Sequence, residues 1–227
     1  MHQGPRPRGG ADLLLLAAAF GYRLSPVAPL PSPDADIRHL VEAGDAPRAA
    51  TLALRAYGPE VLGFLVGMLR NEADASDVFA AFSERLWKGL PRFAWGCSLR
   101  TWCYVLARNE AHRFARGELQ RRGRNVAIEA AEDIAERVRT ETLPFLRTAV
   151  RDAVDELRAT LSPDDRALLI LRVDRELAWE DVALALKGGE LTPADLRRET
   201  ARLRKRFQLV KERILGLAKA KGIGQPE

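Results

Sequence analysis

The sequence predicts an all-α protein, with two small helical domains joined by a polar linker. Apolar residues recur at the i, i+3, i+4 spacing of amphipathic helices along most of the chain. No stretch shows the period-2 alternation of β-branched residues that is typical of strands. Residues 117–142 carry many charges and few large apolar side chains, and this stretch separates two helix-rich blocks. A chain of 227 residues is long enough for two such cores.

Eight helices are expected in these blocks. Their ranges are near 37–44, 46–70, 74–89, 98–122, 143–160, 163–174, 179–187 and 193–218. The expected organisation is an N-terminal extension (1–36), a front domain (37–116), the linker (117–142), a rear domain (143–215) and a flexible tail (216–227).

The extension 1–36 is expected to be disordered or poorly ordered. Its apolar run, ADLLLLAAAFGY, is much shorter than the roughly 20 residues that span a bilayer, so no stable membrane insertion is expected. Arg6 and Arg8 precede the run as in a signal peptide, but Asp12 interrupts the pattern and no clear A-x-A cleavage site follows. The next stretch, SPVAPLPSP, is typical of an extended Pro-rich tether.

The front domain is expected to be a bundle of three or four amphipathic helices. In the helix at 74–89, Asp74 and Asp77 predict a start that resembles a capping box. Gly89 and Pro91 then predict its end. The core stripe between them is Val78, Phe79, Phe82 and Leu86.

The rear domain ends in a helix-turn-helix pattern. Ser162 and Pro163 predict the start of one helix, a second is expected at 179–187, and KGGEL forms the turn before a third. Thr192 predicts the cap of this last helix, whose free N–H groups suit a phosphate. A basic face with small residues fits entry into the major groove, whereas the alternative is a solvated amphipathic face. This face consists of Arg197, Arg198, Ala201, Arg202 and Lys205.

The segment RFAWGCSLRTWCYVLARNEAHRFAR (92–116) mixes aromatic rings, arginines and an amide. Such a mixture fits the capture of unstacked single-strand bases, because rings stack on bases while arginines hold phosphates. Trp95 lies beside a glycine in an expected loop, which favours a binding role. Trp102 lies on the next helix beside apolar residues, where a core position is the more common role. The candidate residues are Arg92, Phe93, Trp95, Arg108, Asn109 and Arg113.

The positions of the charges are stronger evidence for a polyanionic partner than the net charge of +5. Seven arginines fall in 100–124 and ten lysines or arginines fall in 192–221, with an acidic spacer between these two blocks. Two basic blocks suit two contacts with one nucleic acid, while two solvated helix faces are the plainer alternative.

We expect no enzymatic role, no cofactor and no metal site. The three histidines are dispersed, and no Gly-rich phosphate loop or nucleophile–base arrangement occurs. Cys97 and Cys103 are too few for a disulfide framework and lack a metal-ligand spacing with His, so two reduced thiols in a cytosolic protein are expected. A redox role for Cys97 is the alternative, with nothing in the sequence to activate the thiol.

The chain resembles bacterial RNA polymerase sigma factors in two blocks, covering about 50–120 and 145–210. Their second conserved region is similar to RAYGPEVLGFLVGML, DASDVFAAFSERLWKGLPRF and SLRTWCYVLARNEAHRF, and the likeness is closest to the extracytoplasmic-function (ECF) group. Their fourth conserved region is similar to LSPDDRALLILRVDRELAWEDVALAL and TPADLRRETARLRKRF.

The resemblance implies a function for each block. The polar face of the helix at 74–89 would bind a coiled coil of core RNA polymerase through Asp77, Ser83, Glu84, Arg85 and Lys88. The loop 92–98 would receive a base flipped from the −10 promoter element, which Asn109 would also read, and the last helix would read the −35 element. Core RNA polymerase, promoter DNA and an anti-sigma factor are the implied partners, in the cytoplasm.

The turn KGGEL is about two residues longer than is usual in that family, and Ala178, Glu199 and Thr200 also depart from its pattern. Glu199 could accept a hydrogen bond from a cytosine amino group, or it could pair with Lys205 or a neighbouring arginine. One alternative function is a sigma-like interaction protein that binds polymerase or a regulator without reading promoters. A generic helix-turn-helix repressor would leave 46–116 unexplained.

Overall fold

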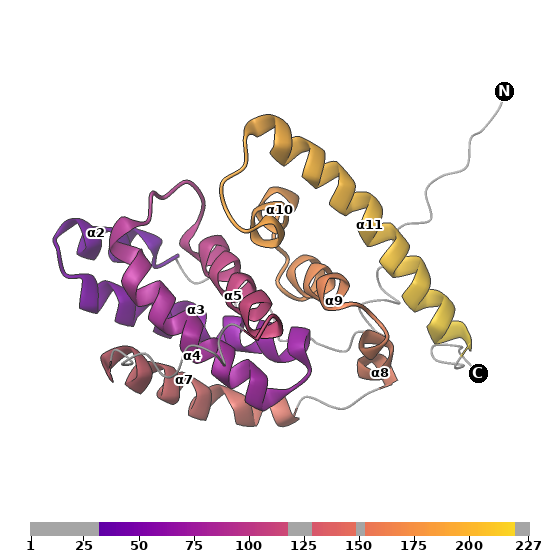
Figure 1. Cartoon of the computed structure of the whole chain (residues 1–227), viewed down its shortest axis with the longest axis horizontal. Helices are drawn as coiled ribbons and strands as arrows, with labels where there is room; N and C mark the ends of the chain where they lie inside the picture. The colour runs from indigo at the N-terminus through magenta and orange to yellow at the C-terminus, as the bar shows by residue number, and fades with distance from the viewer. Residues whose placement is uncertain (1–31, 118–128, 149–152, 221–227) are drawn as a thin grey trace.

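The computed structural model describes residues 32–117, 129–148 and 153–220 (Figure 1). Its regular elements within these ranges are helical, without a strand, which confirms the all-α prediction. The α-helices are α2 (Asp34–Glu42), α3 (Ala46–Leu69), α4 (Glu72–Gly89), α5 (Leu99–Ala115), α7 (Glu129–Thr148), α8 (Ala153–Ala159), α9 (Pro163–Leu169), α10 (Trp179–Lys187) and α11 (Pro193–Ala220). A 3-10 turn, η1 (Leu90–Arg92), follows α4, and a π-helical turn, η2 (Ile170–Asp174), follows α9.

Helix α3 is the central element of the front helices, which we define as α2–α5 and α7. It packs against each of the other four. By length and composition α3 could span a membrane, but half of its most apolar window is buried in the protein. The apolar character of α3 is therefore explained by its central position.

The start of α4 differs from the prediction. Asn71 caps this helix, and its side-chain Oδ1 accepts hydrogen bonds from the backbone N–H groups of Ala73 (2.9 Å) and Asp74 (3.1 Å). The predicted capping role of Asp74 is therefore wrong, because an amide three residues earlier already satisfies the N–H groups of the first turn. Asp74 lies within that turn, where its negative charge favours the helix dipole.

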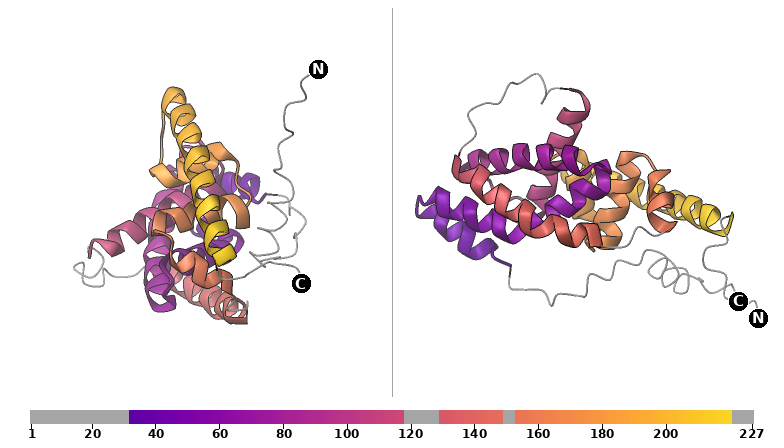
Figure 2. Two further views of the ribbon diagram at one scale, coloured as in Figure 1. Left: turned by 90° about the vertical axis from the view of Figure 1, so that its right-hand side faces the viewer. Right: turned by 90° about the horizontal axis from the view of Figure 1, so that it is seen from below.

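Helix α7 occupies much of the stretch expected to be a linker. It packs against α3 and α4 (Figures 1 and 2). A Cβ placed on Gly58 of α3 would lie 3.1 Å from Cγ1 of Val138, so a glycine permits this close approach. The narrow apolar face of α7 consists of Ala131, Ile134, Ala135, Val138 and Leu143, which lie among many charges in the sequence.

The rear helices, α8–α11, follow the predicted caps closely. Ser162 Oγ accepts from the N–H of Asp165 at 3.2 Å, and Thr192 Oγ1 accepts from the N–H of Asp195 at 3.2 Å. Both capping predictions are confirmed. Gly188 ends α10 with a left-handed φ of +90°, a conformation that glycine adopts without strain. The helix expected at 163–174 is α9 continued by η2.

The front and rear helices share one hydrophobic core. Buried side chains of α3, α4 and α5 belong to the same cluster as those of α9, η2 and α10. The contact is close at Gly67 of α3, where a Cβ would lie 2.8 Å from Cδ1 of Ile170. A second, smaller cluster joins α8, α9 and α11. The structure thus differs from two separately packed domains.

The ends of the chain extend the ordered part beyond the expected boundaries. Asp34 begins α2 and accepts a hydrogen bond from the N–H of Leu99 at 3.0 Å, which ties the predicted extension to the start of α5. Helix α11 continues into the predicted tail as far as Ala220. The remaining parts of the predicted extension, linker and tail, 1–31, 118–128 and 221–227, lie outside the described residues.

Candidate nucleic-acid interface

Three aromatic rings form a cluster at the start of α5. Phe93 stacks on Trp102, with ring centroids 4.6 Å apart and an interplanar angle of 22°, and its centroid lies 4.9 Å from that of Trp95. All three rings are partly buried and pack against the edge of the core. Trp102 therefore belongs to this aromatic cluster (Phe93, Trp95 and Trp102) rather than to the interior of the bundle.

The backbone of Trp95 is held in an unusual conformation. Its φ is +57°, in the left-handed region that bulky residues seldom occupy. The guanidinium of Arg38 on α2 lies 5.6 Å from the Trp95 ring centroid, over its face. Strained backbone of this kind persists only where surrounding contacts enforce it, and it concentrates at functional sites.

The predicted polar readers on α5 are engaged within the chain. Arg108 donates to Asp164 Oδ1 of α9 at 3.0 Å. Asn109 faces the turn after α10, since a Cβ placed on Gly188 would lie 3.0 Å from Asn109 Oδ1. Arg113 donates to both carboxylate oxygens of Glu110, at 2.9 and 3.2 Å. Trp102 and Asn109 thus lie on the same helix, α5, and Phe93 and Trp95 lie in the loop just before it. Arg92 is exposed in η1.

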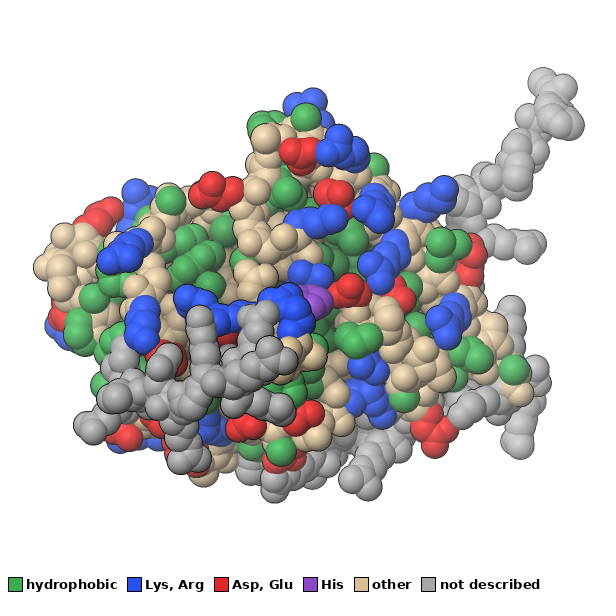
Figure 3. Space-filling view, viewed as in Figure 1, with side chains coloured by type: hydrophobic (Ala, Val, Ile, Leu, Met, Phe, Trp, Pro, Cys, Tyr) green, Lys and Arg blue, Asp and Glu red, His purple; other side chains and the backbone are tan. Residues whose placement is uncertain are grey.

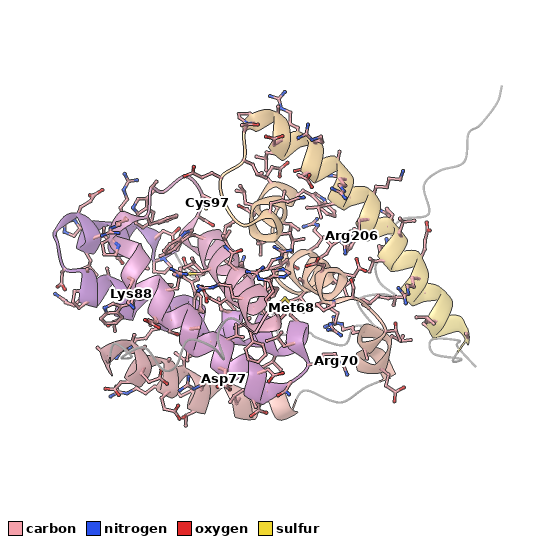
Figure 4. All side chains as sticks on the ribbon, in the orientation of Figure 1. Met68, Arg70, Asp77, Lys88, Cys97 and Arg206 are labelled. Atoms are coloured by element: carbon pink, nitrogen blue, oxygen red, sulfur yellow. The ribbon has the colours of Figure 1, made fainter. Side chains whose placement is uncertain are left out.

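The predicted polymerase-binding residues divide into exposed and buried members. Asp77 and Lys88 are exposed toward opposite ends of α4 (Figure 4). Lys88 pairs with Glu84, and Arg85 donates to Glu110 Oε1 of α5 at 3.1 Å. Ser83 is only 1% exposed, and its hydroxyl donates to the backbone oxygen of Phe79, so its side chain is not offered to a partner.

The predicted duplex-reading face of α11 is open to solvent. Lys and Arg side chains line α11 on the face drawn in Figure 3, and a second basic group lies where α5 meets α9. Arg198 pairs with Asp195 of the same helix turn. The exposed members of the predicted face are Arg197, Arg198, Ala201, Arg202 and Lys205.

Glu199 points toward α10 instead of outward. Its Oε2 lies 3.2 Å from Nζ of Lys187, and its side chain is 13% exposed. The contact to Arg202, at 3.9 Å, is weaker. Of the two roles considered from the sequence, the structure favours pairing with a cation, but the near partner is Lys187 of α10 and not the predicted Lys205.

Glu199→Gln is expected to lower the free energy of unfolding by about 0.5–1 kcal/mol, because it removes one partly exposed ion pair. Urea denaturation followed by circular dichroism measures this change. Lys187→Met should cost a similar amount, and the double variant should cost less than the sum of the two. Fully additive losses would contradict the pairing.

Several supporting residues carried no local sequence signal. Arg100 of α5 donates to both carboxylate oxygens of Glu60 on α3, at 2.7 and 2.9 Å, and to the backbone oxygen of Arg175 at 3.2 Å. Arg38 and Asp34 come from the stretch around the expected start of the first helix. Glu60 and Arg175 lie 40 or more residues from Arg100 in the sequence, so only the folded chain reveals these contacts.

The two thiols are in environments that suppress their reactivity. Burial raises the pKa of the Cys97 thiol, and the nearby carboxylates of Asp181 and Asp34 raise it further. Cys103 is buried, and desolvation raises the pKa of its thiol well above the ordinary value. A raised pKa leaves less of the nucleophilic thiolate at neutral pH, which argues against a redox role for Cys97.

Comparison with known proteins places the aromatic cluster in a recognised domain. Residues 53–122, which include that cluster and Asn109, match the family model of sigma-70 region 2. The chain is also 27% identical over 161 residues to the RNA polymerase sigma-H factor of Pseudomonas aeruginosa, covering 68% of this chain and 82% of that protein. Both findings support an RNA polymerase sigma factor. No solved structure matches the chain significantly.

The sigma-70 region 2 match begins within α3 and includes α4, η1 and α5. It therefore contains both the exposed polar face of α4 and the aromatic cluster. Helices α7–α11 lie beyond it.

Proposed function

We propose that the protein is a sigma factor of the ECF group, which binds core RNA polymerase in the cytoplasm and directs transcription from a subset of promoters. The observation that carries this proposal is the sigma-70 region 2 match over the aromatic cluster and Asn109. The protein supplies recognition and melting of DNA, while the polymerase supplies the chemistry, so the role is not enzymatic.

The aromatic cluster is the proposed site for a base extruded from the −10 element. Stacking on an aromatic ring contributes about 1–3 kcal/mol per base, and extruding a base costs a few kcal/mol. The tilted pair of Phe93 and Trp95 offers ring surface at the protein exterior. Asn109 offers an amide donor and acceptor for a base edge, with Arg92, Arg108 and Arg113 as candidate phosphate contacts.

The polar face of α4 is the proposed contact with core polymerase. Asp77, Glu84, Arg85 and Lys88 present both signs of charge along one helix, which suits specific docking of a charged helical partner. Ser83, being buried, supports this face from beneath through its bond to the backbone.

Helices α9–α11 form the proposed helix-turn-helix unit that reads the −35 element. Helix α11 begins after the Thr192 cap. Its exposed basic residues Arg197, Arg198 and Arg202 lie in the first three turns after that cap. This arrangement fits a recognition helix whose N-terminal turns enter the major groove. An anti-sigma factor is a further proposed partner, on family grounds alone.

Permanganate footprinting with reconstituted polymerase tests the proposal on a promoter found by run-off transcription of genomic DNA. Trp95→Ala and Asn109→Ala are each expected to reduce thymine reactivity in the −10 region by about tenfold, because each removes one base contact of about 1–3 kcal/mol. Arg55→Ala, which alters an exposed residue of α3, should leave melting unchanged.

The competing function is a sigma-like interaction protein that binds polymerase without reading promoters. The engagement of Arg108 and Asn109 within the chain is the observation that favours it. Tight binding of core polymerase by the wild-type chain, with no melting at any native promoter, would support this competitor and refute promoter recognition.

A further inference from the structure

Helix α2 lies outside the sigma-70 region 2 match but packs against helices inside it. The match begins at residue 53, whereas α2 ends at Glu42. Ile37 of α2 is fully buried in the shared core, and the helix packs against α3. Helix α2 therefore has a fixed place on the front helices.

Asp34 anchors the start of α2 to two other helices. Its Oδ2 accepts a hydrogen bond from the N–H of Leu99, the first residue of α5, at 3.0 Å, and its Oδ1 accepts one from the hydroxyl of Tyr57 on α3. Burial and the bond to Asp34 raise the pKa of the Tyr57 hydroxyl above its ordinary value, so this group stays protonated and continues to donate. A carboxylate at the N-terminus of α5 is also favoured by the helix dipole. Asp34 thus fixes α2 against the helix that directly follows the aromatic loop.

Arg38 lies one turn after Asp34 and covers the ring of Trp95. Its guanidinium carbon lies 5.6 Å from the ring centroid. Its Nε donates to Glu42 at 2.9 Å, and 55% of its side chain is exposed. Within the described residues, nothing accepts a hydrogen bond from its two terminal nitrogens. A guanidinium stacked on a ring keeps its N–H donors at its edge, where they can bind a phosphate in bidentate geometry.

The arginines that were predicted to bind DNA beside this cluster are less well placed. Arg108 and Arg113 donate to carboxylates of the same chain. Arg92 is exposed in η1, but its guanidinium does not lie over any ring in the described part of the chain. Of these four arginines, Arg38 alone combines a contact with an aromatic ring and unengaged terminal donors.

A purely positioning role is a weaker explanation of Arg38. A cation–π contact at an exposed site is generally worth less than the cost of a left-handed backbone in a bulky residue. Arg38 by itself therefore cannot hold Trp95 at its φ of +57°. The packing of Phe93 and Trp95 against the core must supply the rest.

We propose that Arg38 binds a backbone phosphate of the single-stranded promoter DNA, next to the base that Phe93 and Trp95 receive. This inference rests on the proposed function, because it assumes that the aromatic cluster receives a base. In sites for single-stranded nucleic acid, rings stack on bases while cations bind the backbone. A base stacked on this cluster brings its own phosphate close to the guanidinium over Trp95. Helix α2 then forms one wall of the site, and Glu42 competes with the phosphate for Arg38.

Binding of single-stranded DNA by the reconstituted holoenzyme tests this assignment. The probe is a fluorescein-labelled oligonucleotide with the non-template −10 sequence of a promoter found by run-off transcription, and fluorescence anisotropy gives its Kd at several salt concentrations. Arg38→Gln removes the proposed contact. Arg48→Gln is the matched control, because it removes the same charge from an exposed arginine in the first turn of α3, whose side chain pairs with Asp45. Circular dichroism verifies that the helix content of each variant is unchanged.

Arg38→Gln is expected to weaken binding about tenfold at low salt, because it removes one charge-assisted contact with a phosphate. The slope of log Kd against log salt concentration should become smaller by about 0.7, the value for one phosphate of a single strand. Arg38→Lys should restore the slope, which counts charge, but only part of the affinity, since an ammonium group lacks the planar fork. Glu42→Gln should tighten binding about twofold, because it removes an exposed competitor for Arg38. Arg48→Gln should match the wild type in both Kd and slope.

An Arg38→Gln variant that matches Arg48→Gln in both Kd and slope would overturn the proposal. Weaker binding with an unchanged slope would also overturn it, in favour of a positioning role. Tighter binding would overturn it too, since Arg38 would then cover a ring face that the base needs. If the wild-type holoenzyme failed to bind the strand, the proposed function itself would be refuted, and this inference with it.

Discussion

Replacing Phe64 with alanine is expected to lower the free energy of unfolding by about 3–5 kcal/mol, because the ring fills the centre of the shared core. Phe64 is fully buried on α3 and packs edge-on against Tyr104 of α5, with ring centroids 5.3 Å apart. Chemical denaturation followed by circular dichroism measures the loss. The shared core predicts one transition, in which the front and rear helices unfold together.

A conservative and a distant substitution bracket this prediction. Phe64→Leu keeps most of the volume and should cost about half as much or less. Leu209→Ala removes a side chain on α11 that is 59% exposed, and it should change stability by less than about 0.5 kcal/mol. A loss at Phe64 no larger than the loss at Leu209 would contradict the central position of the ring.

Asp174→Asn is expected to destabilise the protein by about 3 kcal/mol, because it breaks a bidentate ion pair in a nearly buried site. The two side chains form a bidentate pair between α8 and η2, at 3.0 and 3.1 Å, and their side chains are 9% (Arg158) and 13% (Asp174) exposed. Thermal unfolding of the full chain reports this loss as a fall in Tm.

The matched control for this pair replaces both charges. Arg158→Met with Asp174→Leu keeps the volume and removes both ions, so it should be far less destabilising than Asp174→Asn. If the double variant were as unstable as the single one, the loss would come from side-chain shape rather than from breaking the ion pair.

The helical fold was predictable because its signals are local. The caps at Ser162 and Thr192, the end of α10 and the span of α3 all follow from short motifs and from the spacing of apolar residues. Helix α7 was not found, since its apolar face is narrow and its few apolar residues lie among many charges. The start of α4 was misplaced because Asn71, Asp74 and Asp77, spaced three residues apart, each offer a side chain that can cap a helix.

Part of the candidate site was also predictable from local sequence signals. Phe93 and Trp95 could be singled out by their mixture with arginines and their position beside a glycine, and the structure brings both rings together. The stacking of Trp102, the cation of Arg38 over Trp95 and the position of Asn109 against Gly188 depend on packing between distant segments. No motif encodes the packing of front helices on rear helices.

The docking of α7 on α3 and α4 limits how far the rear helices could move relative to the front helices. Only four residues, 149–152, join α7 to α8, and five peptide steps extend at most about 18 Å. If α7 also detached and unfolded, the 35 residues from 118 to 152 could extend to about 120 Å. The strength with which α7 holds to its two neighbours would then determine how far apart the front and rear helices can be drawn.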